Sequence, residues 1–206
     1  MSTTISTLSL GPHWNGAHLT PEEFDACEDW EPGYRYELIN GVLIVSPPPS
    51  EGERGPNEEL HGLLRDYWKT QDSPPYYYTL PEHTVVTHEN RRRADRVIWA
   101  GLDRFPNVRE DQPTIVVEFV SADRRDRIRD YETKRQEYLS VGIQEYWIID
   151  RFARQMLVVR QTNDGFTEHR IAETERYATK LLPDFELPLS RLFEIADQLR
   201  DRTTDA

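Results

Sequence analysis

The stretch Ile115-Val116-Val117-Glu118-Phe119-Val120 places one carboxylate inside an otherwise apolar run. A run that is apolar at both alternating positions is typical of a central strand buried on both faces. An ionised carboxylate in such a strand is costly unless it is paired or binds a metal. The stretch therefore predicts a buried strand in which Glu118 either belongs to a functional site or forms a buried salt bridge with a nearby arginine.

A second segment, Ala94-Asp95-Arg96-Val97-Ile98-Trp99, repeats this arrangement, with a carboxylate at the head of an apolar strand. If the two strands are neighbours, Asp95 and Glu118 come together and repel each other. A divalent cation such as Mg²⁺, held by one or two carboxylates, removes that repulsion. Asp95 could instead cap a turn, and the residues alone leave both interpretations open.

Length and composition predict one globular domain. The chain has 206 residues, of which 37% are hydrophobic, so it can bury one core. We expect an irregular segment at 1–19, a single domain at 20–200 and a disordered tail at 201–206. The sequence has no signal-peptide pattern, a lone Cys27 and no apolar run near the roughly 20 residues that span a bilayer. A soluble, cytoplasmic protein without membrane contact is expected.

The charge pattern excludes one class of nucleic-acid-binding protein. A formal net charge of -12 argues against coating nucleic acid through bulk positive charge, which depends on many Lys and Arg contacts to phosphate. Any nucleic-acid contact must be local, through clustered arginines. The candidates lie just before Asp95 and just after Glu118, and they are Arg91, Arg92, Arg93, Arg124 and Arg125. A solvated loop is the alternative interpretation of 91–93.

Periodicity and turn residues predict an α/β fold with a mixed sheet flanked by helices. A strand at 114–120, a helix at 123–141 ended by Gly142 and a strand at 145–150 form a crossover unit with parallel strands. Asn40-Gly41 is typical of a type I′ turn in a hairpin. The other expected elements are helices at 21–29, 57–69 and 190–199 and strands at 34–39, 42–45, 76–80, 83–88, 95–99, 156–160 and 166–171.

The helix after Glu118 carries a stripe of residues spaced four apart, namely Asp126, Asp130, Lys134 and Tyr138. Because the helix starts beyond the end of the Glu118 strand, this stripe can aim Lys134 at the two carboxylates. Carboxylates that hold a metal, a water activated by that metal and a positioned ammonium together suit phosphodiester hydrolysis. The alternative is an exposed Asp130–Lys134 ion pair, which contributes about 0.3–0.5 kcal/mol.

The order of several motifs resembles the Uma-type restriction endonuclease family of bacteria, within the PD-(D/E)XK nuclease superfamily. The resemblance covers about residues 20 to 195. The motifs that carry it are Tyr36-Glu37-Leu38-Ile39-Asn40-Gly41, Ser46-Pro47-Pro48-Pro49-Ser50, Asp95, Val117-Glu118-Phe119-Val120-Ser121, Asp130 with Lys134 and Tyr138, and the run from Gly142 to Asp150.

The resemblance implies a restriction-endonuclease-like core and the roles of its site residues. Asp95 and Glu118 match the metal ligands. Val120 stands where the superfamily lysine is usual, so that role falls to Lys134 on the following helix. Glu37 matches a further ligand or water-orienting base, although from its strand position alone it could face solvent. Supporting roles fall to Asp130 and Tyr138, and Ala94 replaces the usual proline before Asp95.

The function that the resemblance implies is a Mg²⁺-dependent DNA endonuclease, with Mn²⁺ as a substitute metal and a homodimer as a plausible assembly for cutting two strands. Two alternatives stay open. One is a nuclease fold that has lost catalysis and serves as a binding or regulatory module. The other is a metal-dependent hydrolase of a different phosphoester.

Overall fold

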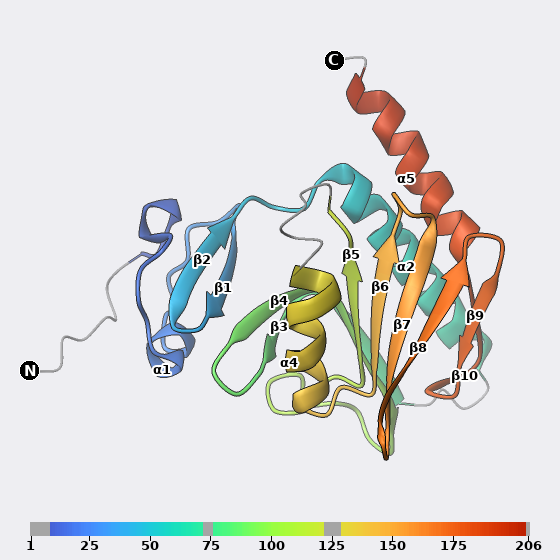
Figure 1. Cartoon of the computed structure of the whole chain (residues 1–206), viewed down its shortest axis with the longest axis horizontal. Helices are drawn as coiled ribbons and strands as arrows, with labels where there is room; N and C mark the ends of the chain where they lie inside the picture. Colours follow the sequence, from blue (N-terminus) through green and yellow to red (C-terminus); the bar gives the residue numbers. More distant parts are fainter. Residues whose placement is uncertain (1–8, 72–75, 122–128, 205–206) are drawn as a thin grey trace, which may run out of the picture. The chain divides into compact units, whose positions relative to one another are not determined.

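The computed structural model describes residues 9–71, 76–121 and 129–204. Figure 1 shows the helices and strands along the chain. The chain divides into two compact units, the first made of Met1–Pro49 and Thr84–Arg93, the second of Ser50–His83 and Ala94–Ala206. A single domain at 20–200 stays a prediction.

The first unit is built on the predicted hairpin. Strands β1 (Arg35–Ile39) and β2 (Val42–Ser46) pair antiparallel, and β1 also pairs with the start of β4 at Arg91. The turn between β1 and β2 has φ values of 50° at Asn40 and 74° at Gly41. Both are positive, as a type I′ turn requires, so the predicted turn is confirmed.

Helix α1 (Pro21–Asp25) has the capping box that its sequence predicts. The Glu23 backbone N–H donates to Thr20 Oγ1, and the Glu23 carboxylate accepts from the Thr20 backbone N–H. The helix ends at Asp25, before the predicted end at 29. The chain turns there, with Trp30 Nε1 donating to the Cys27 carbonyl oxygen at 2.9 Å.

Part of the segment predicted as irregular is ordered into the core of the first unit. It contains a short 3₁₀ turn, η1 (Pro12–Trp14), and Leu10 forms a bridge with Trp30. Leu10 is buried with Phe24, and the same cluster holds Leu38 and Leu43. The segment is therefore fixed by apolar packing, which its local sequence does not reveal.

The second unit contains a mixed sheet in the order β4-β5-β6-β7-β8, with β3 paired to β4. Strands β5 and β6 are parallel, whereas the β4–β5, β6–β7 and β7–β8 pairs are antiparallel. This confirms the α/β class and the predicted crossover unit. The bounds are β3 Tyr76–Val86, β4 Arg91–Leu102, β5 Ile115–Phe119, β6 Glu145–Asp150, β7 Gln155–Thr162 and β8 Gly165–Ala172.

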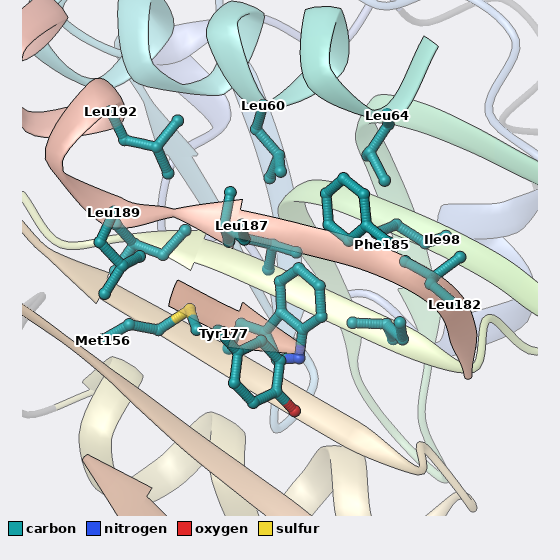
Figure 2. Close-up of a cluster of buried hydrophobic side chains, with 14 of the residues drawn as sticks. Leu60, Leu64, Ile98, Met156, Tyr177, Leu182, Phe185, Leu187, Leu189 and Leu192 are labelled. Atoms are coloured by element: carbon teal, nitrogen blue, oxygen red, sulfur yellow. The ribbon is translucent and has the colours of Figure 1, made fainter. Parts of the chain in front are cut away.

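One face of this sheet is covered by helices α2 (Glu51–Thr70) and α5 (Leu189–Thr204) and by a small hairpin, β9 (Arg176–Thr179) and β10 (Leu182–Pro188). Figure 2 shows the apolar side chains that meet there, among them Leu60 of α2. Because side chains alternate along a strand, residues on either side of Glu118 enter this core while Glu118 faces the other way.

The opposite face carries the short π-helical turn η2 (Arg129–Thr133) and helix α4 (Lys134–Ser140). Figure 1 shows α4 in front of the sheet, and the helix contacts β6. The Tyr138 ring of α4 packs edge-on against Tyr146 of β6, with centroids 5.1 Å apart. The described part of this helix agrees with the prediction, and residues 122–128 lie outside the described residues.

Several boundaries differ from prediction for identifiable reasons. Helix α2 begins at Glu51 rather than at 57, because Ser50 and Glu53 form a capping box and Pro56 is accepted within the helix. Two predicted strands form one continuous β3, which passes Pro81 with Glu82 at φ 50°. Hairpin β9–β10 was not predicted. Helix α5 continues to Thr204, into the tail that was expected to be disordered.

Among the helices that the structure describes, none combines the length and apolar character needed to cross a membrane.

Gly142 ends α4 in a left-handed conformation, with φ 86°. Its N–H donates to the Leu139 carbonyl and the Ile143 N–H donates to the Tyr138 carbonyl, each at 3.2 Å, which is a Schellman motif. Because a Cβ is strained at this φ, Gly142→Ala is expected to lower the free energy of unfolding by about 1–2 kcal/mol. Urea unfolding measures this. Gly62→Ala, inside α2 with open space around its Cα, is the control and should not destabilise.

Candidate active site

Neighbouring strands of the second unit bring the two predicted carboxylates together. The register that pairs Arg96 with Val117 places Asp95 of β4 beside Glu118 of β5. The Phe119 backbone N–H donates to Asp95 Oδ2 at 2.7 Å, which fixes the Asp95 carboxylate against β5. Asp95 and Glu118 expose only 4% and 2% of their surfaces. The predicted meeting of these acids is therefore present in the structure.

Lys134 points from α4 at Glu118, as its helical spacing predicts. Its Nζ lies 2.8 Å from Glu118 Oε1 and 3.2 Å from Asp130 Oδ1, and the side chain is 2% exposed. Tyr138, one turn further on, donates its hydroxyl to Glu118 Oε1 at 3.0 Å. An exposed Asp130–Lys134 pair is therefore the wrong interpretation, because this ion pair is buried.

The acids outnumber the ammonium in this buried cluster. Burial raises the pKa of Glu118 to about 8; Lys134 acts in the opposite direction, and the charges of Asp95 and Asp130 add to the rise. A divalent cation bound beside Glu118 would lower this pKa again, because cations favour the ionised form of neighbouring carboxylates.

Tyr146 supports the cluster from β6. It is fully buried, and its hydroxyl donates to the Asp130 carbonyl oxygen at 3.0 Å. Burial raises the pKa of Tyr146 well above its usual value, and the charge of Glu118 raises it further, so the phenol keeps its proton and remains a donor. Its position two residues before Ile148, on the Glu118 side of the sheet, is the sequence signal that could have found it.

Asn57 of α2 supports Asp95 from the other face of the sheet. Its Nδ2 donates to the Asp95 carbonyl oxygen at 2.9 Å, and its Oδ1 accepts from Arg96 Nε at 2.6 Å. Burial lowers the pKa of Arg96 to about 10, although Glu58 acts to raise it, so Arg96 stays charged at neutral pH. No sequence pattern indicated this contact, because Asn57 and Asp95 are far apart in the chain.

Asp150 is a further acid at the carboxyl end of β6, and it has a structural role. Its Oδ1 accepts from the backbone N–H groups of Phe152 and Ala153, both at 2.9 Å, which closes the turn after the strand. Its Oδ2 accepts from the Tyr131 hydroxyl at 3.0 Å. Asp150 therefore connects the end of β6 to η2.

The residues present fit a hard divalent cation. Asp95 and Glu118 supply carboxylate oxygens from adjacent strands, and Mg²⁺ is usually bound by one or two carboxylates together with water and substrate phosphate oxygens. Within residues 9–71, 76–121 and 129–204, no group of three or more His, Cys, Asp and Glu side chains is arranged to hold a metal. A cation here would rely on this pair of acids and on oxygens from outside the protein.

Glu37 lies in the first unit. It is 4% exposed, and its Oε1 accepts from the Arg93 backbone N–H at 3.1 Å, so the solvent-facing alternative is wrong. A role for Glu37 in catalysis stays a prediction.

The arginines of 91–93 begin strand β4 rather than form a loop. Arg91 donates through Nε and Nη2 to the two carboxylate oxygens of Asp25, at 2.8 and 2.6 Å, and Arg92 is fully buried. Burial therefore argues against a direct phosphate contact by Arg91 or Arg92. Arg93 is half-buried and donates to Thr84 Oγ1. The predicted residues Arg124 and Arg125, and Asp126 of the stripe, lie outside the described residues.

Comparison with protein families gives one match that spans most of the chain. Residues 21–190 match the Uma2 family, which is described as "Putative restriction endonuclease". This chain belongs to the Uma2 family. The family supports a nuclease function, and the resemblance noted in the sequence is confirmed.

Comparison with solved structures supports the fold. The chain is similar to a protein from Anabaena variabilis ATCC 29413, described as a "putative nuclease belonging to DUF820", with a TM-score of 0.64 and 17% identity. The similarity covers 86% of this chain and 99% of that one. Comparison with curated proteins gives no match.

Proposed function

We propose that this Uma2-family protein is a Mg²⁺-dependent DNA endonuclease of the PD-(D/E)XK type, with Mn²⁺ as a substitute metal. The observation that carries the proposal is the buried cluster in which Lys134 Nζ lies 2.8 Å from Glu118 Oε1, with Asp95 on the adjacent strand. Family membership supplies the nucleic-acid substrate. The choice of DNA follows the restriction-endonuclease description of that family.

In this proposal each side chain has a definable task. Asp95 and Glu118 hold the cation, which when bound supplies positive charge to the phosphate and lowers the pKa of a water molecule. Lys134 keeps its ammonium beside them, positions the attacking water and stabilises the negative charge that develops on phosphate oxygens. Tyr138 fixes Glu118 through its hydroxyl, and Asp130 fixes Lys134.

Partners follow from the same proposal. Arg93, Arg124 and Arg125 remain candidates for contact with the nucleic-acid backbone. A homodimer, which would let two sites cut the two strands of a duplex, also remains a proposal.

The first test is the thermal midpoint of the protein with and without Mg²⁺ or Mn²⁺, because it requires no knowledge of the substrate. Binding to the native state alone stabilises by about 2.7 kcal/mol when the metal is at 100 times its Kd. The thermal midpoint of wild type should therefore rise when metal is added, and the midpoint of Asp95→Asn should not. Asp66→Asn, at an exposed position on α2, is the matched control and should keep the rise.

Cleavage of plasmid and single-stranded DNA is the second test. Metal-dependent cleavage that disappears in Asp95→Asn and persists in Asp66→Asn supports the proposal. If neither a rise in midpoint nor cleavage occurs at millimolar metal, the protein is instead a catalytically degenerate module with a nuclease fold. A midpoint rise with activity only on other phosphoesters would identify the protein as a metal-dependent hydrolase of a different phosphoester.

A further inference from the structure

Strand β8 is the last strand of the mixed sheet in the second unit, and its outer edge is open. Among the strands that the structure describes, β8 pairs with β7 alone (Figure 1). Every residue from Gly165 to Arg170 is exposed, on both faces of the strand. An open edge of this kind presents N–H and C=O groups that can pair with the edge of another chain.

The main-chain groups of β8 that point outward can be assigned from the end of the strand. The Ala172 N–H donates to Glu175 Oε2 at 2.7 Å, and the Ala172 carbonyl accepts from the Glu175 N–H at 2.9 Å, so both groups point away from β7. Main-chain groups alternate in direction along an antiparallel strand. Those of Phe166, Glu168 and Arg170 therefore also point outward, along an edge that pairs with β7 without a bulge.

One face of this edge is supported by α4. Arg135 Nη2 lies 2.6 Å from Glu168 Oε1, and the Arg135 Cζ lies 4.2 Å from the centre of the Phe166 ring. The Glu168 side chain still exposes 39% of its surface, and Phe166 exposes 50%. These contacts hold Phe166 and Glu168 beside the open edge and leave both accessible to a second chain.

The charges of β8 are complementary to those of a second copy of β8. When two identical strands pair antiparallel about a two-fold axis at His169, Glu168 of each copy lies opposite Arg170 of the other. Residues directly opposite each other point to the same face of the sheet, and opposite charges there are stabilising. Because both residues direct main-chain groups outward, each facing pair can also exchange two N–H···O=C hydrogen bonds.

The neighbouring two-fold registers are less favourable. Pairing about Glu168 places this carboxylate opposite its own copy, and pairing about Arg170 places two guanidinium groups opposite each other, which is destabilising. Pairing about Thr167 forms no opposite-charge pair and leaves the end of the strand unpaired. Charges on an edge strand usually keep other chains away. Those of β8 leave one register, about His169, in which they attract a second copy.

We propose that β8 pairs antiparallel with β8 of a second copy about His169, so that the mixed sheet continues from one protomer into the other. Main-chain hydrogen bonds join the two edges, and the Glu168–Arg170 pairs select the register. This inference rests on the homodimer proposed above and names its interface, and it requires no catalytic activity. One pair of strands is smaller than a standard interface of about 1,600 Å², so we expect a weak dimer that depends on protein concentration.

The test is sedimentation velocity of the full chain from micromolar to millimolar concentration, over which wild type should change from monomer to dimer. Glu168→Arg brings two positive charges opposite each other, and Arg170→Glu brings two negative charges opposite each other. Each single variant should weaken the dimer roughly tenfold, because both opposite-charge pairs become repulsive. The double variant that carries both substitutions restores opposite charges in the same register and should restore the dimer.

Control variants separate the interface from net charge and from contacts within one protomer. Arg176→Glu and Glu186→Arg make the same charge changes at an exposed ion pair and should dimerise as wild type does. Arg135→Gln removes the partner of Glu168 on α4 and should keep the dimer. Thermal midpoints of all variants identify any loss of folding.

Hydrogen exchange of wild type tests the interface without a substitution. The outward-pointing amides of Glu168 and Arg170 should exchange more slowly at the concentration at which the dimer forms, because the second copy then accepts from them.

The outcomes distinguish this interface from the proposals on which it rests. Rescue by the double variant, with slower exchange in β8, supports the interface whether or not the protein cuts DNA. Single variants that weaken the dimer without rescue overturn the register about His169. A dimer that neither single variant weakens overturns the β8 interface and leaves the homodimer intact. A protein that stays monomeric at millimolar concentration overturns both, whereas the metal and cleavage tests decide the nuclease proposal independently.

Discussion

Lys134→Met is expected to lower the free energy of unfolding by about 3–5 kcal/mol, the usual cost of removing one partner from a buried ion pair. The substitution leaves the carboxylates of Glu118 and Asp130 without the ammonium that lies 2.8 and 3.2 Å from them. Methionine fills similar space, so the loss reports charge more than volume. Urea unfolding at neutral pH measures the difference.

The same variant is expected to lose DNA cleavage by roughly 10²–10³-fold, the effect of removing one group that stabilises developing charge. Lys69→Met is the matched control, because Lys69 is 61% exposed and pairs with Asp66 only at 3.6 Å. Its effect on stability should stay within about 0.5 kcal/mol. A stability loss below about 1 kcal/mol in Lys134→Met would contradict a tightly coupled buried cluster, whatever happens to activity.

The sequence predicts the centre of this cluster because the relevant signals are local. One acid in an apolar run is visible without any knowledge of the fold, and so is the four-residue spacing of Asp130, Lys134 and Tyr138. Spacing gives a shared face but not its burial. Whether the face meets solvent or the sheet depends on how α4 packs against β6, as Tyr138 does against Tyr146, and the spacing alone does not determine that packing.

Contacts between distant segments were beyond prediction for the same reason. The arginines at 91–93 suggested exposed positive charge, yet Arg91 is buried and forms an ion pair with Asp25 of α1, a helix distant in the sequence. Asn57 reaches the backbone of Asp95 from α2, although nothing in the helical pattern marks it. Hairpin β9–β10 alternates too weakly to be recognised alone and is ordered by packing on the sheet.

Glu145 is the strongest case of such a long-range network, and it lies at the amino end of β6, away from the strand ends that carry the candidate site. It is 1% exposed and accepts from four side chains. Arg160 Nε and Thr179 Oγ1 donate to one carboxylate oxygen at 2.8 Å each, and Trp147 Nε1 and the Tyr177 hydroxyl donate to the other at 2.9 and 2.8 Å. This acid holds β9 against β6 and β7.

Glu145→Ala should therefore lower the free energy of unfolding by about 3–5 kcal/mol. The substitution leaves several buried donors without an acceptor and removes the carboxylate that faces Arg160. Glu186→Ala, at an exposed acid of β10, should lower the free energy of unfolding by less than about 1 kcal/mol.

The buried acids Glu145 and Glu118 should also differ in how their variants respond to metal. Glu145→Ala should lower the thermal midpoint but keep the Mg²⁺-dependent rise, whereas Glu118→Gln should lose that rise. If Glu145→Ala lost it as well, metal binding would depend on the whole sheet rather than on the ends of β4 and β5.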